Sequence, residues 1–276
     1  MTATSKPGFS VSDGGFAPIS DSFTDFNSAL PSSGQAGTFG GGSLSQVLYL
    51  TEPGDTNAIS LDDIHQGQLG DCFLLSPIGE LAMQDPSFIQ NMIQNNGNGT
   101  ETVTLYLDRS GRIPLPGDTN LVAHQVTINN TFSSSSVNNA GQDVVGNQQE
   151  IWPQVLEKAV ATLEGGYNAI ANGGNPAEAM EELTGLAAYA FNPTSLSASL
   201  LSAFSAAHDM ITFDTSSNSG LGYNLVSDHA YMFEKVVGSG SSASVQLANP
   251  WGVDQPSLIP VSQFAKNFVE IDVGRT

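Results

Sequence analysis

The sequence is short of basic residues, cysteine and long apolar runs, and each shortage excludes a class of protein. It contains 7 Lys and Arg against 27 Asp and Glu among 276 residues, for a formal net charge of −20. A chain this acidic repels phosphate, so we expect neither nucleic acid nor an anionic membrane as a partner, whereas bound cations are compatible with it. The single cysteine, Cys72, leaves no intrachain disulfide to form, although one thiol is sufficient for catalysis.

Signals for export or membrane insertion are also missing from the printed sequence. Its first residues, MTATSKPGFSVSDGGF, lack the basic and then apolar pattern of a secretory signal. No uninterrupted apolar run reaches the ~20 residues that a membrane-spanning helix requires. We therefore expect a cytoplasmic protein, or one that is secreted without a conventional signal peptide.

Composition divides the chain into a tail and a globular part. Residues 1–45 are rich in Gly, Ser, Ala and Thr and predict a flexible tail. The remainder is long enough for two lobes, each with its own core. Patterns typical of helices predominate early and those typical of strands predominate late, which predicts an α+β fold with a helical lobe over 46–190 and a β-rich lobe over 191–276.

Apolar spacing locates the main elements. Helices are expected from about Cys72 onward and over IWPQVLEKAVATLE, AEAMEELTG and LSASLLSAFSAA. Strands are expected over TVTLYLD, NLVAHQVTI, MITFD, HAYMFEKVV, SVQLAN and FVEIDV. The stretch SSSSVNNAGQD, residues 133–143, has the composition of an exposed loop. Pro77 lies inside the first expected helix, where it removes one backbone donor.

Cys72 is the candidate nucleophile. A lone cysteine beside Phe73 and Leu74 is often a small buried hydrophobe. Cys72, however, follows a glycine-containing loop and begins a helix, whose N-terminal dipole favours the reactive thiolate. Gln66 lies six residues earlier on the same loop, where its amide is either a donor to a developing oxyanion or an ordinary loop side chain.

Among the four histidines, His229 is the candidate base because of the residue expected opposite it. HAYMFEKVV and SVQLAN flank GSGSSA, a hairpin signal, and a turn symmetric about Ser239 sets His229 directly opposite Asn249 on one face. An asparagine there can fix the imidazole ring and its tautomer. Trp251 follows and can cover this hydrogen bond against water. The alternatives are a structural strand histidine and a plain Asn-Pro turn.

These residues also carry a family resemblance. QGQLGDCFLL, DHAYMFEKV and LANPWG resemble, in order, the three signatures of the calpain catalytic core. IWPQVLEKAVATLEGGYNAIANGG, EAMEELTG and VSQFAKNFVEIDV resemble the segments between and after them, so that the resemblance runs from about residue 55 to 276. The compact core with its Gly/Ser-rich tail looks more like a bacterial calpain-like protein than like the animal calpains.

The resemblance implies a papain-like thiol endopeptidase of two lobes that acts on protein or peptide substrates. Cys72 would lie on the helical lobe, and His229 and Asn249 on the antiparallel-sheet lobe. Gln66 would complete the oxyanion hole, and Gly70 and Trp251 would line the substrate cleft. Phe73 departs from the family pattern, which has tryptophan after the cysteine.

The resemblance also implies calcium, although the chemistry itself requires no cofactor. The family's first-lobe site corresponds to Asp63, nine positions before the cysteine, and Glu178, just before the ELTG segment. Carboxylates suit this hard cation, but both residues are otherwise ordinary surface charges. The segment after Trp251, GVDQPSLIPVSQ, is too short for the family's second calcium loop. We therefore expect one calcium site at most.

Two other functions share these residues. A calpain-like module without activity would bind a partner through the same cleft, although such proteins commonly lose one of the catalytic residues. An acyl transferase also uses cysteine and histidine, but its third residue is more often aspartate than asparagine.

Overall fold

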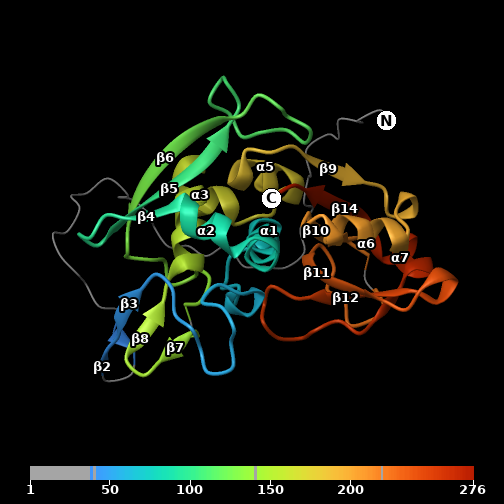
Figure 1. Ribbon diagram of the computed structural model, residues 1–276, viewed down its shortest axis with the longest axis horizontal. Helices are drawn as coiled ribbons and strands as arrows, with labels where there is room; N and C mark the ends of the chain where they lie inside the picture. The colour runs from blue at the N-terminus through green and yellow to red at the C-terminus, as the bar shows by residue number, and fades with distance from the viewer. Residues whose placement is uncertain (1–37, 40–41, 140–141, 219) are drawn as a thin grey trace.

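The computed structural model describes residues 38–39, 42–139, 142–218 and 220–276 (Figure 1). The tail expected over residues 1–45 lies mostly outside these ranges. Two hydrophobic clusters organise the described residues, one between Ile59 and Met210 and the other between Leu196 and Val273. Helix α1 (Cys72–Gln84) lies between them and contacts α5 (Pro176–Thr184) as well as strands of the second cluster.

The first cluster is covered by helices and by two three-stranded sheets, in one of which β3 and β8 pair in parallel. Besides α1 and α5, its helices are α2 (Pro86–Met92), α3 (Trp152–Glu164) and α4 (Tyr167–Ile170), with the 3-10 turn η1 (Leu61–Asp63). One sheet has the order β4-β5-β6, with β4 (Ile93–Asn95), β5 (Thr100–Leu107) and β6 (Val122–Asn129). Another has the order β3-β8-β7, with β3 (Ser45–Val47), β8 (Gln148–Glu150) and β7 (Val144–Val145). A separate two-stranded sheet pairs β1 (Thr38–Phe39) with β2 (Gly42–Ser43).

The second cluster lies against a six-stranded antiparallel sheet of order β13-β12-β11-β10-β14-β9. Its strands are β9 (Ala188–Phe191), β10 (Met210–Thr215), β11 (Ala230–Val237), β12 (Ser244–Ala248), β13 (Ile259–Pro260) and β14 (Phe268–Gly274). The helical segments with it are η2 (Pro193–Ser195), α6 (Ala198–Ala206), η3 (Gly240–Ser242), η4 (Val261–Gln263) and α7 (Phe264–Asn267). The lobe boundary expected between residues 190 and 191 therefore falls within β9.

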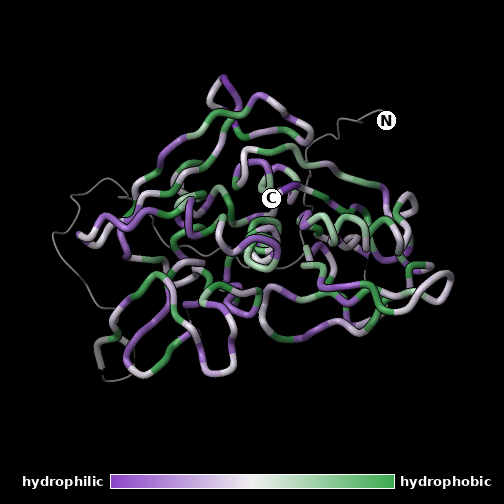
Figure 2. Tube along the Cα trace, in the orientation of Figure 1, coloured by the Kyte–Doolittle hydropathy of each residue, from purple (hydrophilic) through white to green (hydrophobic). Residues whose placement is uncertain are grey.

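Helix α1 is buried on every side, which explains its apolar sequence. All residues from Cys72 to Ala82 are buried, and the helix stays continuous through Pro77. Figure 2 shows the trace of the molecule, with this helix near its middle, coloured by hydropathy. Gly79 allows α1 to approach β11 closely, because a Cβ at this position would lie 2.2 Å from Met232 Sδ. The buried Glu80 carboxylate accepts backbone N–H bonds from β10 and β11. These contacts fix the C-terminal half of α1 relative to the larger sheet.

The prediction of an exposed loop over residues 133–143 is wrong for the central part of this segment. Its buried members are Ser135, Ser136, Val137 and Asn138. The Glu157 carboxylate of α3 accepts hydrogen bonds from the Ser136 hydroxyl and, at 2.8 Å, from the Val137 N–H. Gly67 on the cysteine loop comes so close that a Cβ would lie 2.2 Å from the Ser135 carbonyl oxygen. The polar loop is buried because a buried carboxylate and a neighbouring glycine accommodate its backbone.

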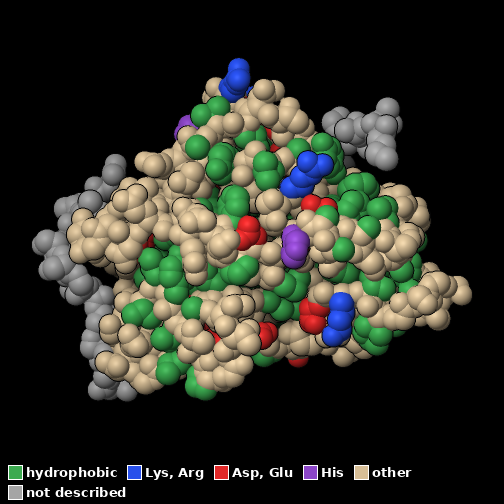
Figure 3. Space-filling view, in the orientation of Figure 1, with side chains coloured by type: hydrophobic (Ala, Val, Ile, Leu, Met, Phe, Trp, Pro, Cys, Tyr) green, Lys and Arg blue, Asp and Glu red, His purple; other side chains and the backbone are tan. Residues whose placement is uncertain are grey.

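Much of the chain's negative charge is inside the protein. Ten of the 27 acidic side chains are buried among the described residues. On the face shown in Figure 3, neutral and apolar side chains predominate and charges of either sign are sparse. Within the same described residues, no helix has the length and apolar character needed to cross a bilayer.

Candidate active site

Cys72 is the first residue of α1 and lies where this helix meets the start of β11. Its side chain is 8% exposed, and its sulfur is hydrogen-bonded to the backbone of Ala230. One turn along α1, the Ser76 hydroxyl donates to the Ala230 carbonyl oxygen at 2.9 Å. Since Ala230 directly follows His229, these two bonds bring the thiol to the residue next to the candidate base.

The thiolate that the helix N-terminus favours is opposed here by the burial of Cys72. Burial is the largest influence and raises the pKa of the thiol to about 12, with smaller contributions from Asp214 and Asp71. The hydrogen bonds to the backbone of Ala230 and Phe73 act in the opposite direction but do not compensate. The resting thiol is therefore protonated, and a base has to remove its proton.

His229 and Asn249 form a buried hydrogen-bonded pair. His229 Nε2 lies 2.9 Å from Asn249 Oδ1, and the two residues are 6% and 1% exposed. The same Asn249 oxygen accepts the Trp251 N–H at 3.0 Å, while its Nδ2 donates to the Asp254 carbonyl at 3.3 Å. An acceptor oxygen requires the proton on Nε2, so the neutral ring keeps Nδ1 free to accept a proton.

The hairpin that carries this pair has a different register from the symmetric one. Val236 lies opposite Val245 near the turn, whereas Met232 lies opposite Ala248 beyond a β-bulge at Glu234. Continuing the second register sets Asn249 opposite Tyr231 rather than His229. The turn is longer than expected because η3 (Gly240–Ser242) is inserted into it. The displacement at the His229 end is two residues, which keeps both side chains on one face.

Aromatic rings enclose the His229 imidazole. The rings of Tyr231 and Trp251 have centroids 4.8 and 4.9 Å from that of His229. The Thr215 hydroxyl accepts the His229 backbone N–H at 2.9 Å and fixes the chain just before β11. Burial lowers the pKa of His229 to about 4, an effect that the hydrogen bond to Asn249 opposes. The resting imidazole is therefore neutral.

The other three histidines have different surroundings. His65 Nε2 lies 3.4 Å from an Asp143 carboxylate oxygen, which raises the pKa of His65. His124 lies in β6, paired with Leu105 of β5. His208 is exposed after α6. His229 is thus the histidine that directly precedes the residue bonded to the Cys72 sulfur.

Gln66 is held within its own loop. Its Nε2 donates to the Leu69 carbonyl at 2.8 Å and to Asp71 Oδ1 at 3.2 Å. Asp71 and Glu157 are fully buried and hydrogen-bonded to each other, and burial raises the pKa of both, so the pair retains a proton. An oxyanion would therefore compete with Leu69 and Asp71 for the Gln66 amide.

Gly70 joins the cysteine loop to the segment that follows α4. Its N–H donates to the Ala171 carbonyl at 3.0 Å, and its carbonyl accepts the Gly173 N–H at 2.9 Å. A Cβ at Gly70 would lie 2.7 Å from the Ala171 oxygen. Glycine is thus required for this close pairing, which places the exposed residues Gly173 and Gly174 beside the cysteine loop.

Asp63 and Glu178, the two expected calcium ligands, lie in different acidic groups. The oxygens of Asp63, Glu52 and Asp55 lie within 4.8 Å of one another. Glu178 instead lines a pocket with Glu164 and Glu182. Among the described residues, Glu178 is not part of the Asp63 group.

Sequence reasoning missed Glu150 beside the Asp63 group. Glu150 is fully buried at the end of β8. Burial is the largest influence that raises its pKa to about 9, and the charges of Asp63 and Glu52 add to it. One of its carboxylate oxygens and one of Glu52 are buried without a hydrogen-bond partner. The sequence signal that could have identified Glu150 is its position directly before the apolar helix segment that begins at Ile151. This helix carries Trp152, whose Nε1 donates to the Asp63 carboxylate at 3.2 Å.

The thiol pKa makes a direct prediction for Cys72 chemistry. Without calcium, alkylation by iodoacetamide should be slow at pH 7 and accelerate about tenfold per pH unit up to about pH 10, because only the thiolate reacts. Since the chain has one cysteine, mass spectrometry of the intact protein gives the rate without ambiguity. The urea-unfolded chain is the control, and its rate should level off near about pH 8.5. Fast alkylation of the folded chain, independent of pH between 6 and 9, would show a stabilised thiolate instead.

Comparison with known proteins assigns this arrangement to a family. The sequence profile described as calpain family cysteine protease matches residues 53–257. The chain therefore belongs to the calpain family of cysteine proteases, and its mixed helices and antiparallel sheets form the calpain protease core domain.

Curated relatives match only part of their own length. Calpain-9 of Rattus norvegicus is 32% identical over 127 residues, which cover 45% of this chain and 16% of that protein. Calpain clp-4 of Caenorhabditis elegans is 27% identical over 211 residues, or 71% of this chain and 28% of that protein. Calpain-13 of Rattus norvegicus is 28% identical over 214 residues, which cover 69% of this chain and 29% of that protein. The chain thus spans less than a third of each of these relatives.

Proposed function

We propose that the protein is a cysteine endopeptidase in which Cys72, His229 and Asn249 hydrolyse peptide bonds through a thioester. One observation carries the proposal: His229, which is buried and hydrogen-bonded to Asn249, directly precedes Ala230, the residue whose backbone is hydrogen-bonded to the Cys72 sulfur. The proposal includes a papain-like two-lobe arrangement, which is supported by the positions of Cys72 at the start of a helix of the first cluster and of His229 before a strand of the second.

The chemistry requires His229 to accept and return a proton in each of two steps, formation of the thioester and its hydrolysis. His229 Nδ1 accepts the thiol proton while the sulfur bonds to the scissile carbonyl carbon and forms an oxyanion. The carbon–nitrogen bond then breaks and His229 returns the proton to the leaving amine. A water molecule next attacks the thioester carbon while His229 accepts one of its protons, and the carbon–sulfur bond breaks as His229 returns that proton to the sulfur. The first transfer creates opposite charges side by side, and their attraction, roughly 4 kcal/mol at 4 Å, offsets part of the cost of ionising buried groups. Asn249 holds the ring in the tautomer that this sequence needs.

Active-site labelling tests the main proposal. A peptide carrying an electrophile should modify Cys72 stoichiometrically, and an unmodified peptide should release two fragments. Binding of peptides without cleavage, at any calcium concentration, would identify a binding module instead. Formation of a product joined to an added amine, in place of free acid, would identify acyl transfer.

Gln66 is proposed as a donor to the oxyanion, together with the Cys72 backbone N–H. Gln66→Ala should lower kcat by about a hundredfold with little change in KM, because the interaction forms only in the transition state. Gln68→Ala, an exposed glutamine on the same loop, is the matched control and should leave both constants unchanged. An effect of Gln66→Ala on KM alone would mean that this side chain only contacts bound substrate.

A calcium site at Asp63 is proposed on the donor set that the structure provides. Asp63, Glu52 and Asp55 supply oxygens within 4.8 Å of one another, and Glu150 adds a buried oxygen without a partner. An all-oxygen set of this kind fits a calcium ion. Bound there, calcium would neutralise the mutual repulsion of these carboxylates. The Asp63 carboxylate is fixed by two hydrogen bonds from Ser60, one from the backbone N–H at 2.7 Å and one from the hydroxyl.

Calorimetry should detect one bound calcium per chain. Glu52→Gln combined with Glu150→Gln should weaken binding at least tenfold, because both supply unpartnered oxygens and neither holds Trp152 or Ser60 as Asp63 does. Glu178→Gln is the matched control and should bind calcium as the wild type does. Full peptidase activity in chelator and no heat of binding would contradict the site, and a loss confined to Glu178→Gln would relocate it.

A further inference from the structure

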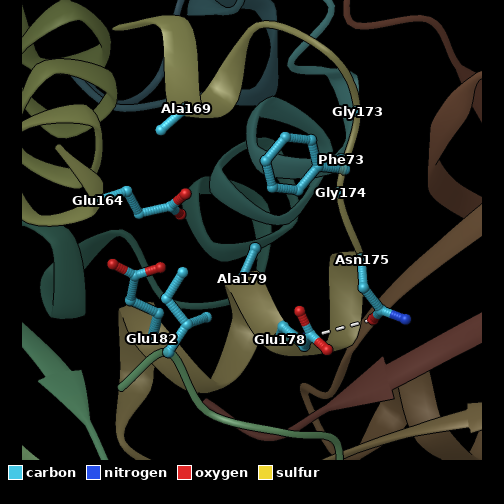
Figure 4. A pocket seen from close by; sticks show the side chains of 10 residues that line it. Phe73, Glu164, Ala169, Gly173, Gly174, Asn175, Glu178, Ala179 and Glu182 are labelled. Atoms are coloured by element: carbon cyan, nitrogen blue, oxygen red, sulfur yellow. Dashed lines mark hydrogen bonds between the residues drawn. The ribbon is translucent and has the colours of Figure 1, made fainter. Parts of the chain in front are cut away.

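A second acidic feature lies beside the cysteine loop, in a pocket at the end of α3 and the start of α5. The cavity has a volume of about 70 Å³ (Figure 4). A single water needs about 10–15 Å³, so the cavity has room for the end of a long side chain. Its rim is exposed at Ala169, Gly173 and Gly174, while Ala179 and Glu182 are buried at 3% and 1%.

Three carboxylates face this pocket, and its lining contains no basic side chain. They belong to Glu164, Glu178 and Glu182. Glu164 and Glu182 are hydrogen-bonded to each other, and burial raises the pKa of both, so they share a proton. The other oxygen of Glu182, Oε1, is buried and has no hydrogen-bond partner. A buried carboxylate oxygen without a partner costs free energy, which an entering cationic group would recover.

The spacing of the carboxylates favours an organic cation over a metal ion. Among the described residues, the acidic group with oxygens within 4.8 Å of one another is that of Asp63, and Glu164, Glu178 and Glu182 do not form such a group. A metal ion requires ligand oxygens around one centre at about 2.3–2.6 Å. A guanidinium group is planar, carries five N–H donors and bonds more than one carboxylate at once.

The walls of the pocket suit the stem of a basic side chain. Phe73 and Ile113 line it together with Ala169 and Ala179, and Phe73 packs so closely under Gly174 that a Cβ there would lie 2.4 Å from the ring. A methylene stem can lie along this apolar surface while its charged end reaches the carboxylates, and a guanidinium can stack on an aromatic ring.

The position of the pocket relates it to the nucleophile. Phe73 is the residue after Cys72, and Gly173 is hydrogen-bonded to Gly70 of the cysteine loop. Resting on the endopeptidase function proposed above, we infer that this pocket is a specificity subsite that receives an arginine or lysine side chain of the peptide substrate. Arginine is the better fit, because its fork can bond Glu164 and Glu182 together.

Peptide binding to the Cys72→Ala chain tests this subsite apart from catalysis. Peptides would be matched in every position except one, which carries arginine, lysine or neutral citrulline, and that position would be moved along the sequence. At one position the arginine peptide should bind at least tenfold more tightly than its citrulline partner. This preference should fall below about threefold in Glu164→Gln/Glu182→Gln. It should persist in Glu234→Gln, which removes a carboxylate of β11 outside the pocket.

Each outcome decides the inference. Equal affinity for arginine and citrulline at every position, no peptide binding, or a preference that survives in Glu164→Gln/Glu182→Gln would overturn it. Glu178→Gln, at a half-buried position, is a milder second variant if the double variant does not fold. Calorimetric calcium binding that disappears in the double variant would make the pocket a metal site. Tight binding of arginine peptides that the wild-type chain never cleaves would support the subsite and contradict the endopeptidase function. Cleavage of peptides without a preference for a basic residue would support the endopeptidase function and contradict the subsite.

Discussion

Cys72→Ala should abolish peptide hydrolysis while the fold and the affinity for peptide remain. The sulfur is the proposed nucleophile, and no other thiol exists in the chain to replace it. Removing one buried sulfur from the first residue of α1 should lower the free energy of unfolding by only about 1 kcal/mol. The decisive measurement is kcat/KM on a peptide that the wild type cleaves, with circular dichroism of both proteins for comparison.

Two further results would bear on that assignment. Cys72→Ser keeps the hydrogen-bonding geometry with a weaker nucleophile and should also be inactive. Residual turnover of Cys72→Ala within about tenfold of wild type, or roughly 1.4 kcal/mol in the barrier, would show that another group performs the attack.

His229→Ala should reduce kcat/KM by about a thousandfold or more, while Asn249→Ala should reduce it by only about ten- to a hundredfold. The imidazole moves the proton, whereas the asparagine amide only orients the ring and supplies no full charge. Because the two act through one hydrogen bond, the double variant should be within about threefold of His229→Ala alone. A double-mutant cycle of kcat/KM measures this coupling directly.

His124→Ala provides the matched control, since this histidine lies in β6, away from the sheet that carries the pair. It should leave kcat/KM unchanged. Additive losses for His229→Ala and Asn249→Ala would mean that they act independently, and full activity of His229→Ala would require a different base.

The sequence predicted the longer elements well, because their apolar spacing is decided by the core they face. The helix expected over IWPQVLEKAVATLE is α3 (Trp152–Glu164), and TVTLYLD and NLVAHQVTI pair as β5 and β6. Spacing did not predict the burial of α3 on its polar side, where Glu157 and Lys158 are only 0% and 4% exposed. It also did not predict β9 or the short β3-β8-β7 sheet, since strands of two to four residues carry too little pattern.

The residues of the candidate site also fall into those that the sequence could predict and those that it could not. His229 and Asn249 were predictable because a hairpin relates residues through local turn chemistry. The acidic groups were not, because Glu150 and Asp63, or Glu164 and Glu182, meet only through tertiary packing. The buried Asp71–Glu157 pair was missed for the same reason, and so was the thiol pKa, which depends on the depth of Cys72 and not on its position at a helix start.

The bulge at Glu234 restricts how this hairpin can change in evolution. Near the turn Val236 faces Val245, and if that pairing continued unbroken, Asn249 would face Met232, on the opposite side of the strand from His229. The extra residue that the bulge adds to β11 returns the His229 and Asn249 side chains to the same face of the hairpin. A single-residue insertion or deletion within the paired parts of β11 or β12 would therefore separate them, whereas the turn at η3 can change in length without altering the register. Related chains should accordingly vary in the turn but keep the bulge in the strands between His229 and the turn, or lose it together with an odd change in those strands.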